Sequence, residues 1–82
     1  MIKNQESRKR MGAQIAALRA ELGMTQQELG DRAGIKQPHI ARIEKGAYSV
    51  GLDTLDTIAT AMNAEVRIVP KNDGKNPEKP RR

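Results

Sequence analysis

The chain has 82 residues, a mass of 9.1 kDa and a net charge of +5, so it has room for one small domain. It has no cysteine and a single histidine, which excludes disulfides and leaves no thiolate or histidine cluster for a metal ion. Its apolar runs fall far short of the roughly 20 residues that span a bilayer, and its charged start lacks a signal-peptide core. We therefore expect a cytoplasmic protein with no membrane association, metal or cofactor.

Basic residues are concentrated at both ends of the chain. Residues 1–10 hold four basic side chains and one acidic, and residues 71–82 hold five basic and two acidic. Between them, acidic residues slightly outnumber basic ones. Basic ends indicate an anionic partner such as nucleic acid, although solubility would explain them equally well.

Apolar residues recur at helical spacing from Met11 to Leu22. This periodicity predicts a first helix over residues 7–22, and the glycine that follows is placed to end it. Thr25 and Glu28 then have the spacing of a capping box, in which each side chain satisfies a free backbone amide at a helix start.

The second helix is predicted to be short, over residues 26–33. A third should begin within a residue of Lys36–Pro38, because proline fits the first helical turn and pushes the preceding residue toward extended geometry. Gly46 stands just past the end of this helix. Apolar residues along one stripe predict a fourth helix over residues 52–62.

After the fourth helix, where Asn63 suits a left-handed cap, the pattern changes. Residues 64–69 alternate and are rich in β-branched side chains, which predicts a short strand closed by Pro70. Residues 71–82 contain no apolar side chain, so we expect them to be disordered. A lone strand leaves its backbone groups unpaired, and pairing with a second copy is the simplest remedy. The alternative is a frayed segment or an edge packed on its own domain.

The proposed strand pair has a preferred register. Centring an antiparallel pair on Val66 would set Glu65 opposite Arg67 of the second copy. It would also place Ala64, Val66 and Ile68 on one apolar face. The residues predicted to form the dimer contact are Glu65, Val66, Arg67 and Ile68.

Two short helices joined by a tight glycine-containing turn form a helix-turn-helix, whose second helix can enter the DNA major groove. The run Met24–Gly46, MTQQELGDRAGIKQPHIARIEKG, strongly resembles the bacterial (XRE-like) family that includes the phage Cro and cI repressors. The resemblance covers about Arg10–Met62 and implies an all-α, four-helix, lambda-repressor-like domain, here followed by the short C-terminal strand. The chain is therefore predicted to have four parts. Residues 1–10 form a basic N-terminal arm and the start of the first helix, and residues 11–63 form the DNA-binding domain. Residues 64–70 form the dimerisation strand, and residues 71–82 form the disordered basic tail.

The resemblance also implies which residues touch DNA. Gln26 is similar to a residue that contacts a phosphate and braces the recognition helix, and Gln37 to a glutamine that reads the N6 and N7 edge of adenine. Implied contacts to bases or nearby backbone come from Lys36, Pro38, Ala41 and Arg42, and implied phosphate contacts from Lys45, Tyr48 and Ser49. The family often has Ser or Thr where this chain has Lys36, which cannot accept the hydrogen bonds of a helix cap. The same polar side chains would also suit an ordinary solvated helix face.

The implied function is a sequence-specific regulator of transcription that binds double-stranded DNA as a homodimeric repressor, with the third helix in the major groove. We expect no enzymatic activity and no catalytic residue, because neither Ser7 nor Ser49 stands in a motif with His39. The stretch from Ile35 through the strand more loosely resembles the antitoxin of the Hip toxin–antitoxin module. The alternative function is therefore an antitoxin that neutralises a toxin protein and autoregulates its operon.

Overall fold

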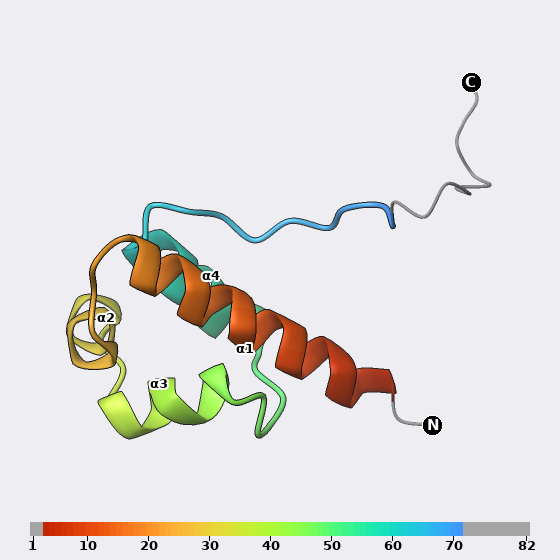
Figure 1. Ribbon diagram of the computed structural model, residues 1–82, viewed down its shortest axis with the longest axis horizontal. Helices are drawn as coiled ribbons and strands as arrows, with labels where there is room; N and C mark the ends of the chain where they lie inside the picture. The colour runs from red at the N-terminus through yellow and green to blue at the C-terminus, as the bar shows by residue number, and fades with distance from the viewer. Residues whose placement is uncertain (1–2, 72–82) are drawn as a thin grey trace.

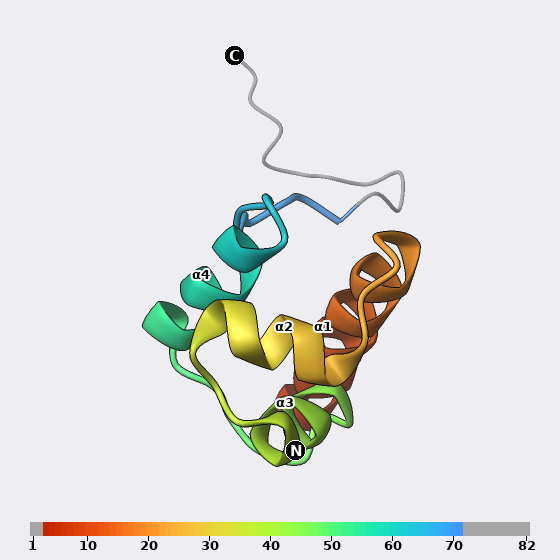
Figure 2. The same cartoon turned by 90° about the vertical axis from the view of Figure 1, so that its left-hand side faces the viewer.

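The computed structural model of the protein describes residues 3–71. Four helices follow one another in the predicted order, α1 (Lys3–Glu21), α2 (Gln26–Ala33), α3 (Gln37–Glu44) and α4 (Leu52–Ala61). The predicted all-α fold is confirmed. The long helix α1 packs against α3, and α2 packs against both α3 and α4 (Figures 1 and 2). None of these described helices combines the length and apolar character that crossing a membrane requires.

An aliphatic core joins the four helices. Leu29, Ile40 and Ile58, from α2, α3 and α4, are completely buried, and Ile15 of α1 belongs to the same cluster. Burying an aliphatic side chain of this size contributes about 1.5–3 kcal/mol to folding. The core therefore fixes the position of α3 relative to the other three helices.

Local signals at the helix ends are confirmed. At the start of α2, Thr25 Oγ1 accepts from the Glu28 amide at 3.0 Å, while Glu28 Oε1 accepts from the Thr25 amide at 2.9 Å. Gly34, with a φ of 72°, ends α2 in the left-handed region that glycine adopts without strain. Lys36 caps α3 without a side-chain hydrogen bond, as its chemistry requires. Asn63 follows α4 with a φ of 58°.

Three helix boundaries differ from those predicted. α1 begins at Lys3 and not at Ser7, because its first turn is built from polar residues with adequate helix propensity and no apolar periodicity. Leu22 lies just beyond the end of α1 and is 49% exposed, so it does not complete the apolar stripe. Met62, predicted as the last residue of α4, is instead its buried C-cap.

Residues 64–71 leave α4 as an extended segment on the side of α1 and α4 opposite α3 (Figures 1 and 2). The predicted strand does not form a ladder here, because residues 3–71 contain no second strand to pair with it. Val66 is partly buried over a groove of ≈ 560 Å³ between α1 and α4. Ile68 and Val69, in contrast, are 100% and 70% exposed. The tail predicted to be disordered lies outside the described residues from position 72 onward.

Candidate nucleic-acid interface

The face of α3 that points away from the core is polar. Ile40 and Ile43 are buried, whereas the predicted contacts on this helix, its caps and the following loop are exposed or partly buried. The exposed members are Lys36, Pro38, Arg42, Lys45 and Ser49, and the partly buried members are Gln37, Ala41 and Tyr48. The remaining predicted contact, Gln26, opens α2 and is partly buried.

Gln26 and Gln37 are joined by their side-chain amides. Gln37 Nε2 donates to Gln26 Oε1 at 2.7 Å, and Gln26 Nε2 donates to Glu44 Oε1 at 2.8 Å. A side-chain amide offers two N–H donors and an acceptor oxygen. Within residues 3–71, Gln37 therefore keeps one N–H and its oxygen free of hydrogen bonds, and Gln26 keeps one N–H free.

Glu44, at the end of α3, is also paired with Arg19 of α1. Arg19 Nε and Nη2 donate to the two Glu44 oxygens at 2.7 and 3.0 Å, and Nη1 donates to the Met24 carbonyl oxygen at 2.9 Å. The two side chains are 18% and 6% exposed. The hydrogen bond to Glu44, aided by its negative charge, raises the pKa of Arg19 above its ordinary value, although partial burial opposes this. The guanidinium therefore stays charged and anchors a side-chain network that runs from α1 to Gln37.

Arg19 and Glu44 were not predicted as site residues, although the sequence held a signal. Arg19 stands four residues after Ile15, and Glu44 stands four residues after Ile40. Each charge therefore shares the apolar face of its helix. Opposite charges on two core-facing stripes are typical of an ion pair, because a buried charge needs a partner.

His39 of α3 is hydrogen-bonded to Tyr48, which lies in the loop that follows the helix. The Tyr48 hydroxyl and His39 Nε2 are hydrogen-bonded, and the two rings meet edge to face with their centroids 5.4 Å apart. The Tyr48 side chain also packs against the hydrophobic core. The loop that carries Ser49 is therefore held at a defined position beside α3.

The fold and site together define a four-helix domain in which α2 and α3 form a helix-turn-helix and α3 bears an exposed polar face. The chain belongs to the helix-turn-helix family, whose model matches residues 15–68. This match confirms the resemblance to the Cro/cI-type, XRE-like proteins.

Curated relatives and one solved structure show the same relationship. The chain is 40% identical over 58 residues to an uncharacterized HTH-type transcriptional regulator, y4dL, of Sinorhizobium fredii. It is 32% identical over 59 residues to the immunity repressor protein of Bacillus phage phi105. These alignments cover 71% and 72% of the chain but 30% and 41% of the two relatives, so the chain spans less than half their length.

The crystal structure of the restriction-modification controller protein C.AhdI from Aeromonas hydrophila superposes with a TM-score of 0.74. The superposition covers 78% of this chain and 93% of that chain at 23% identity, a likeness that shows the shared fold. The looser resemblance to the Hip antitoxin gains no support from these proteins.

Proposed function

We propose that the protein is a sequence-specific regulator of transcription that binds double-stranded DNA with α3 in the major groove. The observation that carries this proposal is the position of Gln37, whose amide is braced by Gln26 at 2.7 Å. Its free N–H and oxygen match the N7 acceptor and N6 donor of adenine, a bidentate pair that specifies one base. Helix-turn-helix family membership and relatives named as transcriptional regulators support the same function.

The charge of this surface also supports DNA binding. From Lys36 to Ser49 the sequence holds a single acidic residue, Glu44, and its carboxylate is occupied by Arg19. Three cations therefore remain around α3 without a competing carboxylate from the same stretch, namely Lys36, Arg42 and Lys45. We assign base contacts, with nearby backbone, to Lys36, Gln37, Pro38, Ala41 and Arg42, and phosphate contacts to Gln26, Lys45, Tyr48 and Ser49.

The first test is selection of random duplex DNA by the full-length protein at one stated salt concentration. We expect an enriched palindrome with half-sites about 10 base pairs apart. Gln37→Ala should then cost about 1–3 kcal/mol at one base pair and relax its identity, whereas Lys45→Gln should weaken all sequences alike. If Gln37→Ala leaves both the preferred sequence and the affinity unchanged, α3 does not read bases through this residue.

The proposed mechanism is repression, in which a homodimer bound to DNA occludes a promoter. A homodimer is proposed because a two-fold axis presents two recognition helices to major grooves about 34 Å apart. Residues 65–71 make no backbone hydrogen bond within the described chain, and Ile68 is wholly exposed. Glu65 and Arg67 form an exposed ion pair at 2.6 Å. An antiparallel pair centred on Val66 would let these groups pair across two copies and would give the segment the ladder it lacks.

Truncation and a point change together test the dimer. A chain ending at Lys71 should keep the dimeric mass in solution, whereas a chain ending at Asn63 should be monomeric. Ile68→Asp should also give a monomer with unchanged helical content, because this side chain touches nothing in the single chain. Sedimentation equilibrium measures the masses, and equal masses for all three chains would contradict strand pairing.

The antitoxin function makes a different prediction. A toxin-neutralising protein should co-purify with a protein partner, and DNA selection in its absence should give salt-sensitive binding without an enriched sequence. That combination would replace the repressor proposal.

A further inference from the structure

The N-terminal half of α1 lies directly against the turn that ends α3. A Cβ atom on Gly46 would stand 2.7 Å from Lys9 Cα and 2.8 Å from the Lys9 nitrogen, closer than Cβ contacts occur in proteins. Gly46 also has a φ of 71°, which favours glycine. The basic start of the chain is therefore helical from Lys3 and fixed beside the loop that carries the proposed phosphate contacts (Figure 1).

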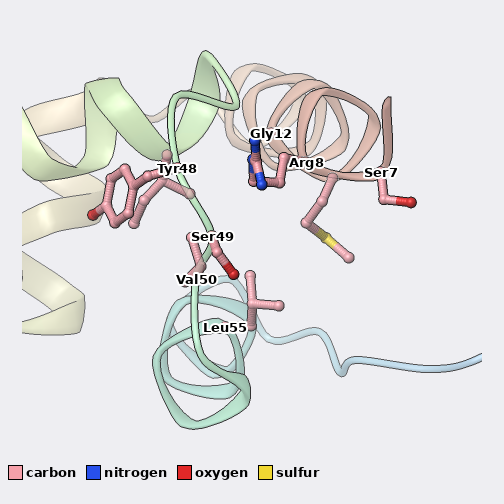
Figure 3. Close-up of a pocket in the computed structure, with 9 residues that line it drawn as sticks. Ser7, Arg8, Gly12, Tyr48, Ser49, Val50 and Leu55 are labelled. Atoms are coloured by element: carbon pink, nitrogen blue, oxygen red, sulfur yellow. The ribbon is translucent and has the colours of Figure 1, made fainter. Parts of the chain in front are cut away.

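A cavity of ≈ 190 Å³ opens between α1, this loop and α4. Figure 3 shows the Arg8 side chain leaving α1 on the side of the loop, with Ser49 and Val50 across from it. The lining contains one charged side chain, Arg8, and no carboxylate. Its other hydrogen-bonding side chains are those of Ser7, Tyr48 and Ser49, and Tyr48 is already bonded to a histidine.

Arg8 has an unmet hydrogen-bonding requirement. Its Nε is buried and has no hydrogen-bond partner, and it is the one buried side-chain polar atom of residues 3–71 in this condition. An N–H removed from water without an acceptor costs free energy, so the resting position of this side chain is a poor one. The planar edge of a guanidinium matches an oxyanion in a bidentate way. If the guanidinium turned outward to bind an oxyanion, Arg8 Nε would gain the acceptor that it lacks.

We propose that Arg8 and Ser49 form a phosphate site that holds the DNA backbone beside α3, so that α1 extends the interface beyond the helix-turn-helix. This inference rests on the proposed function. DNA is favoured as the source of the phosphate because the opposite wall of the cavity carries Tyr48 and Ser49, both assigned to phosphates. The exposed Lys9 and Arg10 continue the positive charge along α1. A free phosphate ion shares the same chemistry and is separated by the test.

The test compares Arg8→Gln with Arg32→Gln, which removes the same charge from an exposed position on α2 beside Asp56 and Thr60 of α4. Affinity for the selected duplex is measured by fluorescence anisotropy between about 50 and 200 mM salt. Arg8→Gln should weaken binding and lower the slope of log K against log salt by about 0.9, the value of one phosphate contact. Arg32→Gln should keep the wild-type slope, and Arg8→Lys should restore it because the charge is retained.

The following results would each contradict the proposed phosphate site at Arg8 and Ser49. If Arg8→Gln is folded by circular dichroism and keeps the wild-type slope, α1 holds no phosphate. If inorganic phosphate saturably shifts the amide resonances around Arg8 while the DNA slope stays unchanged in Arg8→Gln, the site serves a free ion and not DNA. If the wild-type protein binds no duplex, both the proposed function and this inference are wrong. If the wild-type protein binds the duplex and Arg8→Gln has the same dependence of log K on log salt, only this inference is wrong.

Discussion

Arg19→Met is expected to lower the free energy of unfolding by about 3 kcal/mol, because it leaves a buried carboxylate without its cation. Glu44 is 6% exposed and would keep only the hydrogen bond from Gln26 at 2.8 Å. The substitution also removes the donor to the Met24 carbonyl oxygen, which ties the end of α1 to the start of α2. Urea denaturation followed by circular dichroism measures the loss.

The double variant Arg19→Met, Glu44→Leu separates the pair's effect on stability from its effect on recognition. Replacing both charges by apolar side chains of similar size should recover much of the lost stability, since neither charge is then buried alone. Gln26 would still lose the acceptor for its Nε2 donor, so Gln37 would be held less firmly. We therefore expect a stable double variant with relaxed base preference. If Arg19→Met lowers the free energy of unfolding by less than about 1 kcal/mol, the ion pair between Arg19 and Glu44 does not stabilise the fold as expected.

Gly12→Ala is expected to destabilise the fold by about 2 kcal/mol, although alanine ordinarily favours a helix by about 1 kcal/mol over glycine. The added carbon would lie 2.4 Å from the Glu44 carbonyl oxygen and 2.5 Å from that of Ile43. Both atoms belong to the backbone of α3, so relief requires α1 and α3 to move apart. Because this contact sets the position of α3, the proposed recognition helix, DNA affinity should fall as well.

Gly51→Ser provides the matched control for a larger side chain at a glycine. An added Cβ at Gly51 meets no atom within 4 Å, and this residue is the N-cap of α4. A serine hydroxyl can cap the helix, so stability should rise by a few tenths of a kcal/mol. Thermal unfolding measured side by side compares the two variants, and a Gly12→Ala protein as stable as wild type would show that α1 and α3 are not in backbone contact.

Features that depend on neighbours a few residues apart followed from the sequence. The capping box of Thr25 and Glu28, the left-handed Asn63 after α4 and the uncapped start of α3 at Lys36 all form where the sequence predicts them. Their hydrogen bonds join atoms within one helical turn, so residue type and spacing suffice to define them. The resemblance over Met24–Gly46 was informative for the same reason, because it lies in one continuous run.

Contacts between distant segments depend on how the helices pack against one another. The spacing of Arg19 and Glu44 places each charge on the apolar stripe of its own helix, but that the two meet across 25 residues follows from the packing of α1 on α3. The unmatched Arg8 nitrogen likewise depends on where the loop after α3 meets α1. Residue type and spacing were enough to predict the order of the helices, most of their caps and the polar face of α3, because these features depend on interactions within a turn. The hydrogen bonds that hold Gln37 through Gln26 and Glu44 depend on helix packing. A charged or amide group is stable in a protein interior only where another segment provides its hydrogen-bond or charge partner.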